Sequence, residues 1–311
     1  MPFLGEICAL LTALCWTASS TAFAVASRAV GPLPANQFRL LGALPVLFVL
    51  AVVVTGQAWP TQATGHQLGL LVLSGLAGLV LGDLGYFYAL AKIGPRLCSV
   101  ILATWPACTV AMEAVVGRLP NGAMLAGIAL TMVGVTVVLL RSGDGAVWNA
   151  TTSPRQRLLG IAGALLGAVG QALGFVLAGY GMAAGERGEV AVDPLLASVV
   201  RMAVAVLGLQ AVAAVHRQPF AVKAVFGHRT ALRAAMVGAV FGPIGGVWLS
   251  MVARSRASDA GVASALIATT PVFMMPVAYL LYRARIGVLG VLGTLVAVAG
   301  VALCFVARPA A

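Results

Sequence analysis

Residues 78–117, GLVLGDLGYFYALAKIGPRLCSVILATWPACTVAMEAVVG, set the pattern of the chain, because a weaker copy of them returns at residues 238–282. The first parts of the two copies, GLVLGDLG and GAVFGPIG, lie 160 residues apart, and the later parts, SVILATWP and SALIATTP, lie 165 apart. Each copy contains an apolar helix, a short polar turn and a second apolar helix interrupted by proline, a layout typical of transporters built from repeats. The sequence therefore indicates a duplication.

Apolar composition places the chain in a membrane. Hydrophobic residues make up 61% of the 311 positions and charged residues 9%, whereas soluble domains carry about 25% charged residues. A membrane-spanning helix needs about 20 consecutive apolar residues. The predicted fold is therefore all-α and integral to the membrane, with ten transmembrane helices and no separate soluble domain. The ten runs cover residues 4–27, 35–54, 68–91, 97–117, 121–140, 158–182, 194–215, 234–253, 260–282 and 286–307.

Two halves follow from the polar stretch RSGDGAVWNATTSPRQR, which divides the ten runs equally. We expect a first five-helix repeat at residues 1–142, a linker at 143–157 and a second five-helix repeat at 158–311. Arg39 in helix 2 aligns with Arg201 in helix 7 at a difference of 162. Because each half has an odd number of crossings, the second half must enter the membrane from the opposite side. The sequence thus predicts two inverted repeats.

The net charge of +11 comes from basic residues scattered through short loops, so nucleic acid is not an expected partner. The loops after helices 1, 3, 5, 7 and 9 contain twelve Lys or Arg, and the other loops and termini contain five. This bias favours a cytoplasmic position for the first set of loops, with both termini outside. The five cysteines lie in or beside apolar runs and are interpreted as packing residues, not as a disulfide framework.

Four ionisable residues lie beyond the first turn of the predicted spans, namely Arg39, Asp83, Glu113 and Arg201. Each costs about 2.5–3.5 kcal/mol at the bilayer centre and so needs a partner or a water-filled cavity. At a rise of about 1.5 Å per residue, Arg39 and Asp83 lie roughly 6 and 12 Å from one side of the membrane. Glu113 and Arg201 lie roughly 6 and 10 Å from the other side. We expect an Arg39–Asp83 pair and an Arg201–Glu113 pair that line or gate a central path. The alternative is that the arginines reach the headgroups and the acids only neutralise them.

Matching prolines indicate where a substrate would bind. Pro106 and Pro271 interrupt helices 4 and 9, and paired interruptions of this kind favour a site between the two halves. Thr104 and Thr269 stand two residues before each proline. Their hydroxyls could either repair the broken backbone ladder or face a ligand.

Four further side chains are candidates for the same site. In the repeat alignment Trp16 lies opposite Gln171, in the middle of helices 1 and 6. Tyr86 and Trp105 offer apolar surface with a polar group, although membrane aromatics are also common as anchors at the interface.

The sequence shows no motif typical of a phosphate-binding loop, a metal site or an enzyme active site. The two lysines do not follow the glycine spacing of a phosphate-binding loop, and the three histidines fall in loops without metal-ligand spacing. The spans hold no cluster of nucleophile, base or acid that an enzyme would need. We therefore expect no enzyme activity, no cofactor, no metal and no use of ATP.

With these features the chain resembles the ten-helix EamA-type members of the drug/metabolite transporter superfamily. The resemblance lies in GDLGYFYALAKIGP from Gly82 to Pro95, in the helix 4 run that ends at Pro106, in the glycine-spaced fifth helix of each half, and in the paired helix 2 arginines. Such proteins commonly have a glutamate about twelve residues after the helix 4 proline, where this chain has Arg118 and Arg283. A role inferred from that glutamate does not carry over.

The resemblance implies two five-helix bundles around a central cavity, in a multi-pass protein of the cell (inner) membrane. It implies movement of small metabolites such as amino acids, often outward, by alternating access and without ATP. Members are usually drawn with both termini in the cytoplasm, opposite to the charge count. The implied partners are a small-molecule substrate and the lipid bilayer, with a proton as a candidate coupling ion and either a monomer or a homodimer. The rival functions are a channel-like facilitator and a membrane-embedded enzyme.

Overall fold

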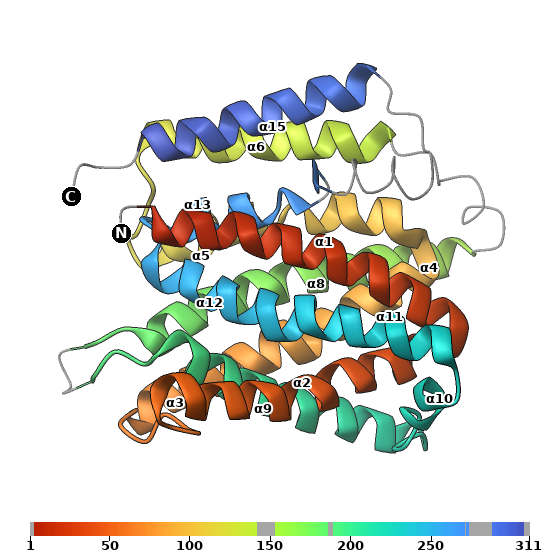
Figure 1. Cartoon of the computed structure of the whole chain (residues 1–311). Helices are drawn as coiled ribbons and strands as arrows, with labels where there is room; N and C mark the ends of the chain where they lie inside the picture. The colour runs from red at the N-terminus through yellow and green to blue at the C-terminus, as the bar shows by residue number, and fades with distance from the viewer. Residues whose placement is uncertain (1–2, 142–152, 186–188, 271, 274–287, 308–311) are drawn as a thin grey trace.

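The computed structural model describes residues 3–141, 153–185, 189–270, 272–273 and 288–307. Most of these residues are helical, and no β-strand occurs among them apart from an isolated bridge between Gly185 and Glu189. Six helices within the described part are long and apolar enough to cross a membrane, and two shorter apolar helices accompany them. The helices run side by side, and α1 begins at the same end of the bundle at which α15 ends (Figure 1). We call this end the terminal end, and the other the opposite end.

Helices of the first half begin and end at local signals. Gly31, with φ of 91°, separates α1 from α2, and a capping box on Thr64 starts α3. Thr64 satisfies a free amide of the first turn, as such caps do. The helices are α1 (Leu4–Val30), α2 (Pro32–Thr55), α3 (Gly65–Ser74), the π-helix η1 (Gly75–Gly82), α4 (Asp83–Leu102), α5 (Trp105–Val115) and α6 (Gly122–Arg141).

The second half shows the same kind of signals. Ser153 forms a capping box at the start of α8, and the side chain of Asp193 caps α9. The helices are α8 (Pro154–Met182), α9 (Pro194–Val215), the short α10 (Lys223–Phe226), α11 (Arg229–Ala239), the π-helix η2 (Val240–Gly246), α12 (Val247–Arg256), α13 (Ala260–Ile267) and α15 (Val288–Val306). Part of the expected ninth helix, including Pro271, lies outside the described residues.

The residues of α4 contain a reversal of the chain at the opposite end. Cys98 Sγ lies 3.8 Å from the carbonyl oxygen of Tyr86, whereas twelve residues of straight helix would separate them by about 18 Å. Leu102 likewise returns to Gly167, which also faces the Tyr86 amide. The first part of α4 therefore continues η1, and the second part leads back toward α5 (Figure 1).

Both copies of the opening sequence contain a π-helix, a feature that the sequence did not predict. η1 and η2 occupy corresponding helices of the two halves. Each lies against the first helix of the other half, where small residues allow close approach. A Cβ on Gly174 in α8 would lie 2.9 Å from the Cα of Gly78 in η1, and a Cβ on Gly242 in η2 would lie 2.3 Å from Ser19 Oγ in α1. π-Helices are rare and often occur at functional sites.

Packing sorts the helices into two groups of corresponding elements. The α1 group contains α1, α11, η2, α12 and α13, because α1 packs along all of the others. The α8 group contains α3, η1, α4, α5 and α8, because α8 packs along its other members. Two further contacts join corresponding helices, α2 with α9 and α6 with α15. The two groups meet mainly through α5, α12 and α13, which lie toward the terminal end (Figure 1).

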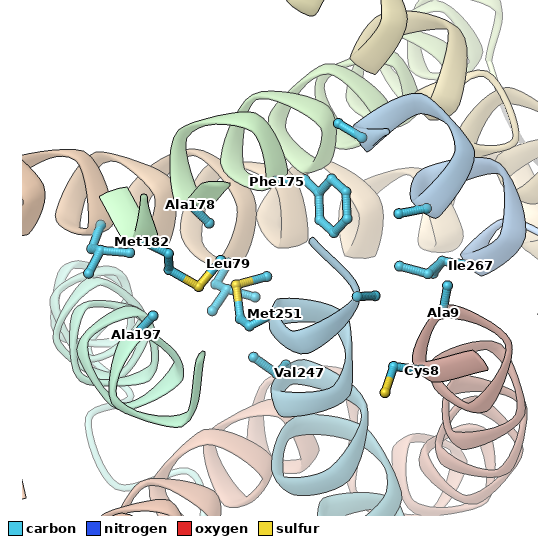
Figure 2. Close-up of a cluster of buried hydrophobic side chains, with 14 of the residues drawn as sticks. Cys8, Ala9, Leu79, Phe175, Ala178, Met182, Ala197, Val247, Met251 and Ile267 are labelled. Atoms are coloured by element: carbon cyan, nitrogen blue, oxygen red, sulfur yellow. The ribbon is translucent and has the colours of Figure 1, made fainter. Parts of the chain in front are cut away.

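An apolar core fills the junction of the groups at this end. Figure 2 shows side chains of α1, α8, α9, α12 and α13 directed toward one another, together with Leu79 of η1. Met182 and Met251 lie next to each other in the middle of the view. Flexible thioethers fill irregular space well, so this junction can repack if the groups move.

Glycines hold α6 and α15 in close contact, and this contact yields the first prediction. A Cβ on Gly134 would lie 2.3 Å from the backbone nitrogen of Ala297, which cannot move aside alone. Gly134→Ala is expected to destabilise the protein by about 1–3 kcal/mol, a typical cost of overpacking. Thermal unfolding of purified protein in detergent measures this loss.

Gly42 provides the matched control, because it also lies inside a helix but a Cβ there meets no atom within 4 Å. Gly42→Ala should leave the melting temperature unchanged or raise it, since alanine favours helix by about 1 kcal/mol over glycine. Equal effects of the two substitutions would contradict the close α6–α15 contact.

Candidate functional site

Arg39 and Asp83 form an ion pair, as their depths predicted. Arg39 Nη2 of α2 bonds Asp83 Oδ2 at the start of α4. The two side chains are 20% and 16% exposed. Their partly buried position strengthens the attraction relative to a surface pair. The pair ties α2, which lies outside both groups, to the α8 group.

Glu113 does not pair with Arg201, so that prediction is wrong. Its Oε1 accepts from Nη2 of Arg254 at 2.6 Å, and its Oε2 accepts from the Tyr180 hydroxyl at 3.0 Å. Arg254 Nε also donates to the Phe175 carbonyl at 3.2 Å. The prediction failed because helix 8 was expected to end at residue 253, whereas α12 continues to Arg256. Arg254 is therefore a helix residue at the depth of Glu113.

This three-residue cluster joins the two helix groups. Arg254 belongs to α12 of the α1 group, whereas Glu113 and Tyr180 belong to α5 and α8 of the α8 group. The side chains of Arg254 and Glu113 are 12% and 4% exposed. We call Glu113, Tyr180 and Arg254 the terminal gate. Charge-assisted bonds with so little exposure are strong, and an unpaired member would be costly to bury.

Further charged groups surround the terminal gate. The Arg118 guanidinium lies over the Tyr180 ring at 5.0 Å. Glu6, only 1% exposed in α1, accepts from both the amide and the hydroxyl of Ser258. Asp259 caps α13 through the amides of Gly261 and Val262. Burial raises the pKa of the Asp259 carboxyl, and the two amide bonds act in the opposite direction.

Arg201 lies deep in α9 and makes a different set of contacts. It is 3% exposed, and its Nη1 donates to Met251 Sδ at 2.8 Å. A Cβ on Gly78 would lie 3.3 Å from both Arg201 Nη2 and Gln171 Oε1. Arg201 and Gln171, two of the predicted site residues, therefore converge on one point of η1.

Trp16 takes the corresponding position in the other group. Its indole lies against Gly246, where a Cβ would be 2.6 Å from the ring. Thus Trp16 of α1 faces η2, as Gln171 of α8 faces η1. The two residues therefore each lie against a π-helix of the opposite half, at different positions along it.

Thr104 and Thr269 use their hydroxyls to bond backbone carbonyls at the ends of the preceding helices. α4 ends at Leu102 and α5 starts at Trp105, and the hydroxyl of Thr104 donates to the Ile101 carbonyl at 2.7 Å. Thr269 donates to the Leu266 carbonyl at 2.6 Å. Of the two alternatives for these threonines, the structure shows repair of the backbone ladder. Pro106 is buried next to Trp105 in the first turn of α5, after the expected break.

The two aromatic candidates, Trp105 and Tyr86, have different surroundings. Trp105 is 5% exposed and packs edge-on against Phe175, with ring centroids 5.5 Å apart. It therefore supports the α5–α8 contact beside the terminal gate. Tyr86 is partly buried near the reversal in α4, where its carbonyl faces Cys98.

No group of three potential metal ligands occurs among the described residues. A cavity of about 430 Å³ opens at the opposite end, lined by Pro34 of α2 and by residues 217–221 and 224. It lies away from the terminal gate and from Arg201. The chemistry available at the junction of the groups is thus charge pairing and hydrogen bonding.

The fold and this site define a multi-pass α-helical membrane protein whose two packed groups of helices are joined by charges. The model of the EamA-like transporter family matches residues 3–140 and 157–306. The chain belongs to this family, which confirms the resemblance to the drug/metabolite transporter superfamily. A crystal structure of another protein is similar over 99% of this chain and 98% of its own, with a TM-score of 0.75 and 18% identity. This likeness concerns the fold alone. No curated protein matches the chain.

Proposed function

We propose that the protein is a secondary transporter that moves small metabolites, such as amino acids or related compounds, by alternating access, and that it works as an exporter in the inner membrane of the cell. The observation that carries this proposal is the terminal gate. Its ion pair joins the α1 group to the α8 group at one end of the bundle. A charge pair that bridges two packed units can hold one end closed and release it when the units part.

The proposal includes ten membrane-spanning helices arranged as two inverted five-helix repeats, at residues 1–142 and 158–311. It is supported by the way corresponding helices pack. α1 contacts the helix containing η2, just as α8 contacts the helix containing η1, and α2 packs against its counterpart α9. Exchanging the two halves leaves this set of contacts unchanged. Two units related in this way can open to either side by similar motions.

A reconstitution experiment tests the proposed function and constitutes the second prediction. Liposomes containing the full chain are loaded with a defined mixture of amino acids, organic acids, amines and nucleosides, and the losses are followed by mass spectrometry. We expect at least one compound to leave with saturable kinetics, and to leave faster when the same compound is present outside. Acceleration from the far side requires a site that alternates between the two sides.

The rival functions give different results in the same liposomes. Flux that rises linearly with concentration, without acceleration from the far side, would support a channel-like facilitator. A new product formed from lipid or solute would support an enzyme. Loss no faster than from protein-free liposomes for every compound would contradict the proposal. Imposing a pH gradient on the compound that moves would identify a proton as the coupling ion.

A further inference from the structure

Arg201 is a buried cation without an ion-pair partner among the described residues. The ion pairs there are Arg39–Asp83, His66–Glu189 and Arg254–Glu113. Arg201 gives one hydrogen bond to the Met251 thioether, and its Nε has no partner within the described part of the chain. A guanidinium carries five N–H donors, and a thioether is a weak acceptor. The hydrogen-bonding capacity of this side chain is therefore largely unused.

The internal repeat offers Arg201 no acid like the one that Arg39 has. Arg39 and Arg201 occupy corresponding positions of the two halves, and Arg39 bonds Asp83. In the alignment of GLVLGDLG with GAVFGPIG, Asp83 corresponds to Pro243. The second half thus has the cation, but proline stands in place of the carboxylate. Asp83 acts on Arg201 through space, but its Oδ2 is bonded to Arg39.

An uncompensated cation at this depth is expensive. Insertion scales assign about 2.5–3.5 kcal/mol to arginine at the centre of a membrane helix, and such residues usually mark a path for a substrate or an ion. Arg201 is only 3% exposed, so water at the surface does not solvate it in this conformation. An anion that enters with the substrate would supply the missing charge.

Neighbouring groups shape the place where such an anion would bind. Gln171 Oε1 and Arg201 Nη2 border the point at which Gly78 has no side chain. No hydrogen bond of the Gln171 amide to protein occurs among the described residues, so its NH₂ group is available as well. The two side chains come from α8 and α9 and meet at the π-helix η1. Arg201 directs N–H donors at this point, and Gln171 presents its NH₂ group there once its amide plane turns over, because Oε1 faces the point in this conformation.

We infer that Arg201, with Gln171, binds a carboxylate of the transported solute, an inference that rests on the proposed function and names its substrate class. A carboxylate matches the planar fork of arginine through two parallel N–H···O bonds. One cation balances its single charge. A phosphate dianion would leave one negative charge without a balancing cation. The substrate class is therefore small organic acids and amino acids.

Matched pairs of ligands test this inference. Acetate and acetamide, lactate and lactamide, benzoate and benzamide, and L-leucine and L-leucinamide are titrated onto the full chain in lipid nanodiscs, with tryptophan fluorescence and thermal stability as readouts. Inorganic phosphate and methylamine serve as further probes. We expect at least one carboxylate to bind at least 10-fold more tightly than its amide. In Arg201→Gln this ratio should fall to about one, whereas Arg201→Lys should keep a weakened preference.

Gly78→Ala provides a second variant in case Arg201→Gln fails to fold. Its Cβ would lie 3.3 Å from two side chains that can move, so the protein should remain folded while the space for a carboxylate shrinks. We expect weaker carboxylate binding with little change in the melting temperature of the unliganded protein. Gly42→Ala, a helical glycine with no neighbour within 4 Å, should bind as the wild type does.

The outcomes separate this inference from the proposed function. The inference is overturned if no carboxylate binds, if amides, amines or phosphate are preferred, or if Arg201→Gln binds carboxylates with unchanged affinity. Carboxylate binding that depends on Arg201, but without accelerated exchange in liposomes, would support the inference and contradict the transporter. Exchange of an amine that is insensitive to Arg201→Gln would support the transporter and contradict the inference.

Discussion

Arg254→Gln is expected to lower exchange flux in liposomes by about 10- to 100-fold. The substitution leaves Glu113 buried without its cation, and breaking a buried ion pair from one side costs about 3–5 kcal/mol. If half or more of this cost falls on the state in which the terminal end is closed, the population of that state decreases by 10-fold or more, since 1.4 kcal/mol corresponds to a factor of ten. Each transport cycle must pass through that state.

The reverse substitution and the exchange of charges complete the test of the terminal gate. Glu113→Gln should reduce flux in the same way, because it leaves Arg254 with only the Phe175 carbonyl and the face of aromatic rings. The double variant Glu113→Arg with Arg254→Glu restores opposite charges across the groups and should recover part of the flux. Arg256→Gln, at an exposed residue two positions along α12, is the control and should transport normally.

Two results would contradict the proposed role of the terminal gate. One is wild-type flux in both single variants at equal amounts of folded protein. The other is a folded double variant that recovers nothing that the single variants lose.

Asp83→Asn is expected to be more damaging than Arg39→Gln, although the two residues form one ion pair. Asp83 bonds Arg39 and also acts electrostatically on Arg201. Removing its charge therefore leaves two cations in the bundle, whereas Arg39→Gln leaves an acid that still faces Arg201. The amount of monodisperse protein after detergent extraction and its melting temperature measure the difference. We expect a loss of about 3 kcal/mol or more for Asp83→Asn.

Exchanging the two charges of this ion pair should restore only part of the stability that the single variants lose. Arg39→Asp with Asp83→Arg restores the attraction between α2 and α4, but it places a second cation near Arg201. Full recovery by the exchange would show that Asp83 has no effect on Arg201. Equal losses in Asp83→Asn and Arg39→Gln would lead to the same conclusion.

The sequence predicted those parts of the fold that depend on apolar periodicity and proline. The break before Pro106 and the Arg39–Asp83 pair were expected, whereas the close packing of α6 against α15 was not. The two π-helices were not expected either, because GLAGLVLG and VFGPIGG contain only apolar and small residues, so a wider helical turn leaves no trace in the pattern. Their positions are set by contact with α1 and α8, which is a tertiary effect.

The candidate site was less predictable for a similar reason. Arg254 was counted as a loop residue, since charge at the end of an apolar run usually marks the membrane surface. One signal could have identified Arg254: a buried Glu113 needs a cation at the same depth in the membrane. Glu6 was missed because it stands in the first turn of the first predicted span, where a charge usually lies at the membrane surface. It is buried beside Gly5, where a Cβ would lie 2.0 Å from the backbone of Ala257.

A distance measurement across the terminal end tests the central claim, that two helix groups part and rejoin there. Spin labels are placed at Val115→Cys and Ser255→Cys, two exposed positions on α5 and α12, after the five native cysteines are replaced by alanine. Pulsed electron paramagnetic resonance in nanodiscs should show a shorter and a longer distance, with the longer one gaining population in the Arg254→Gln background. A single distance that is the same with and without Arg254 would contradict the account.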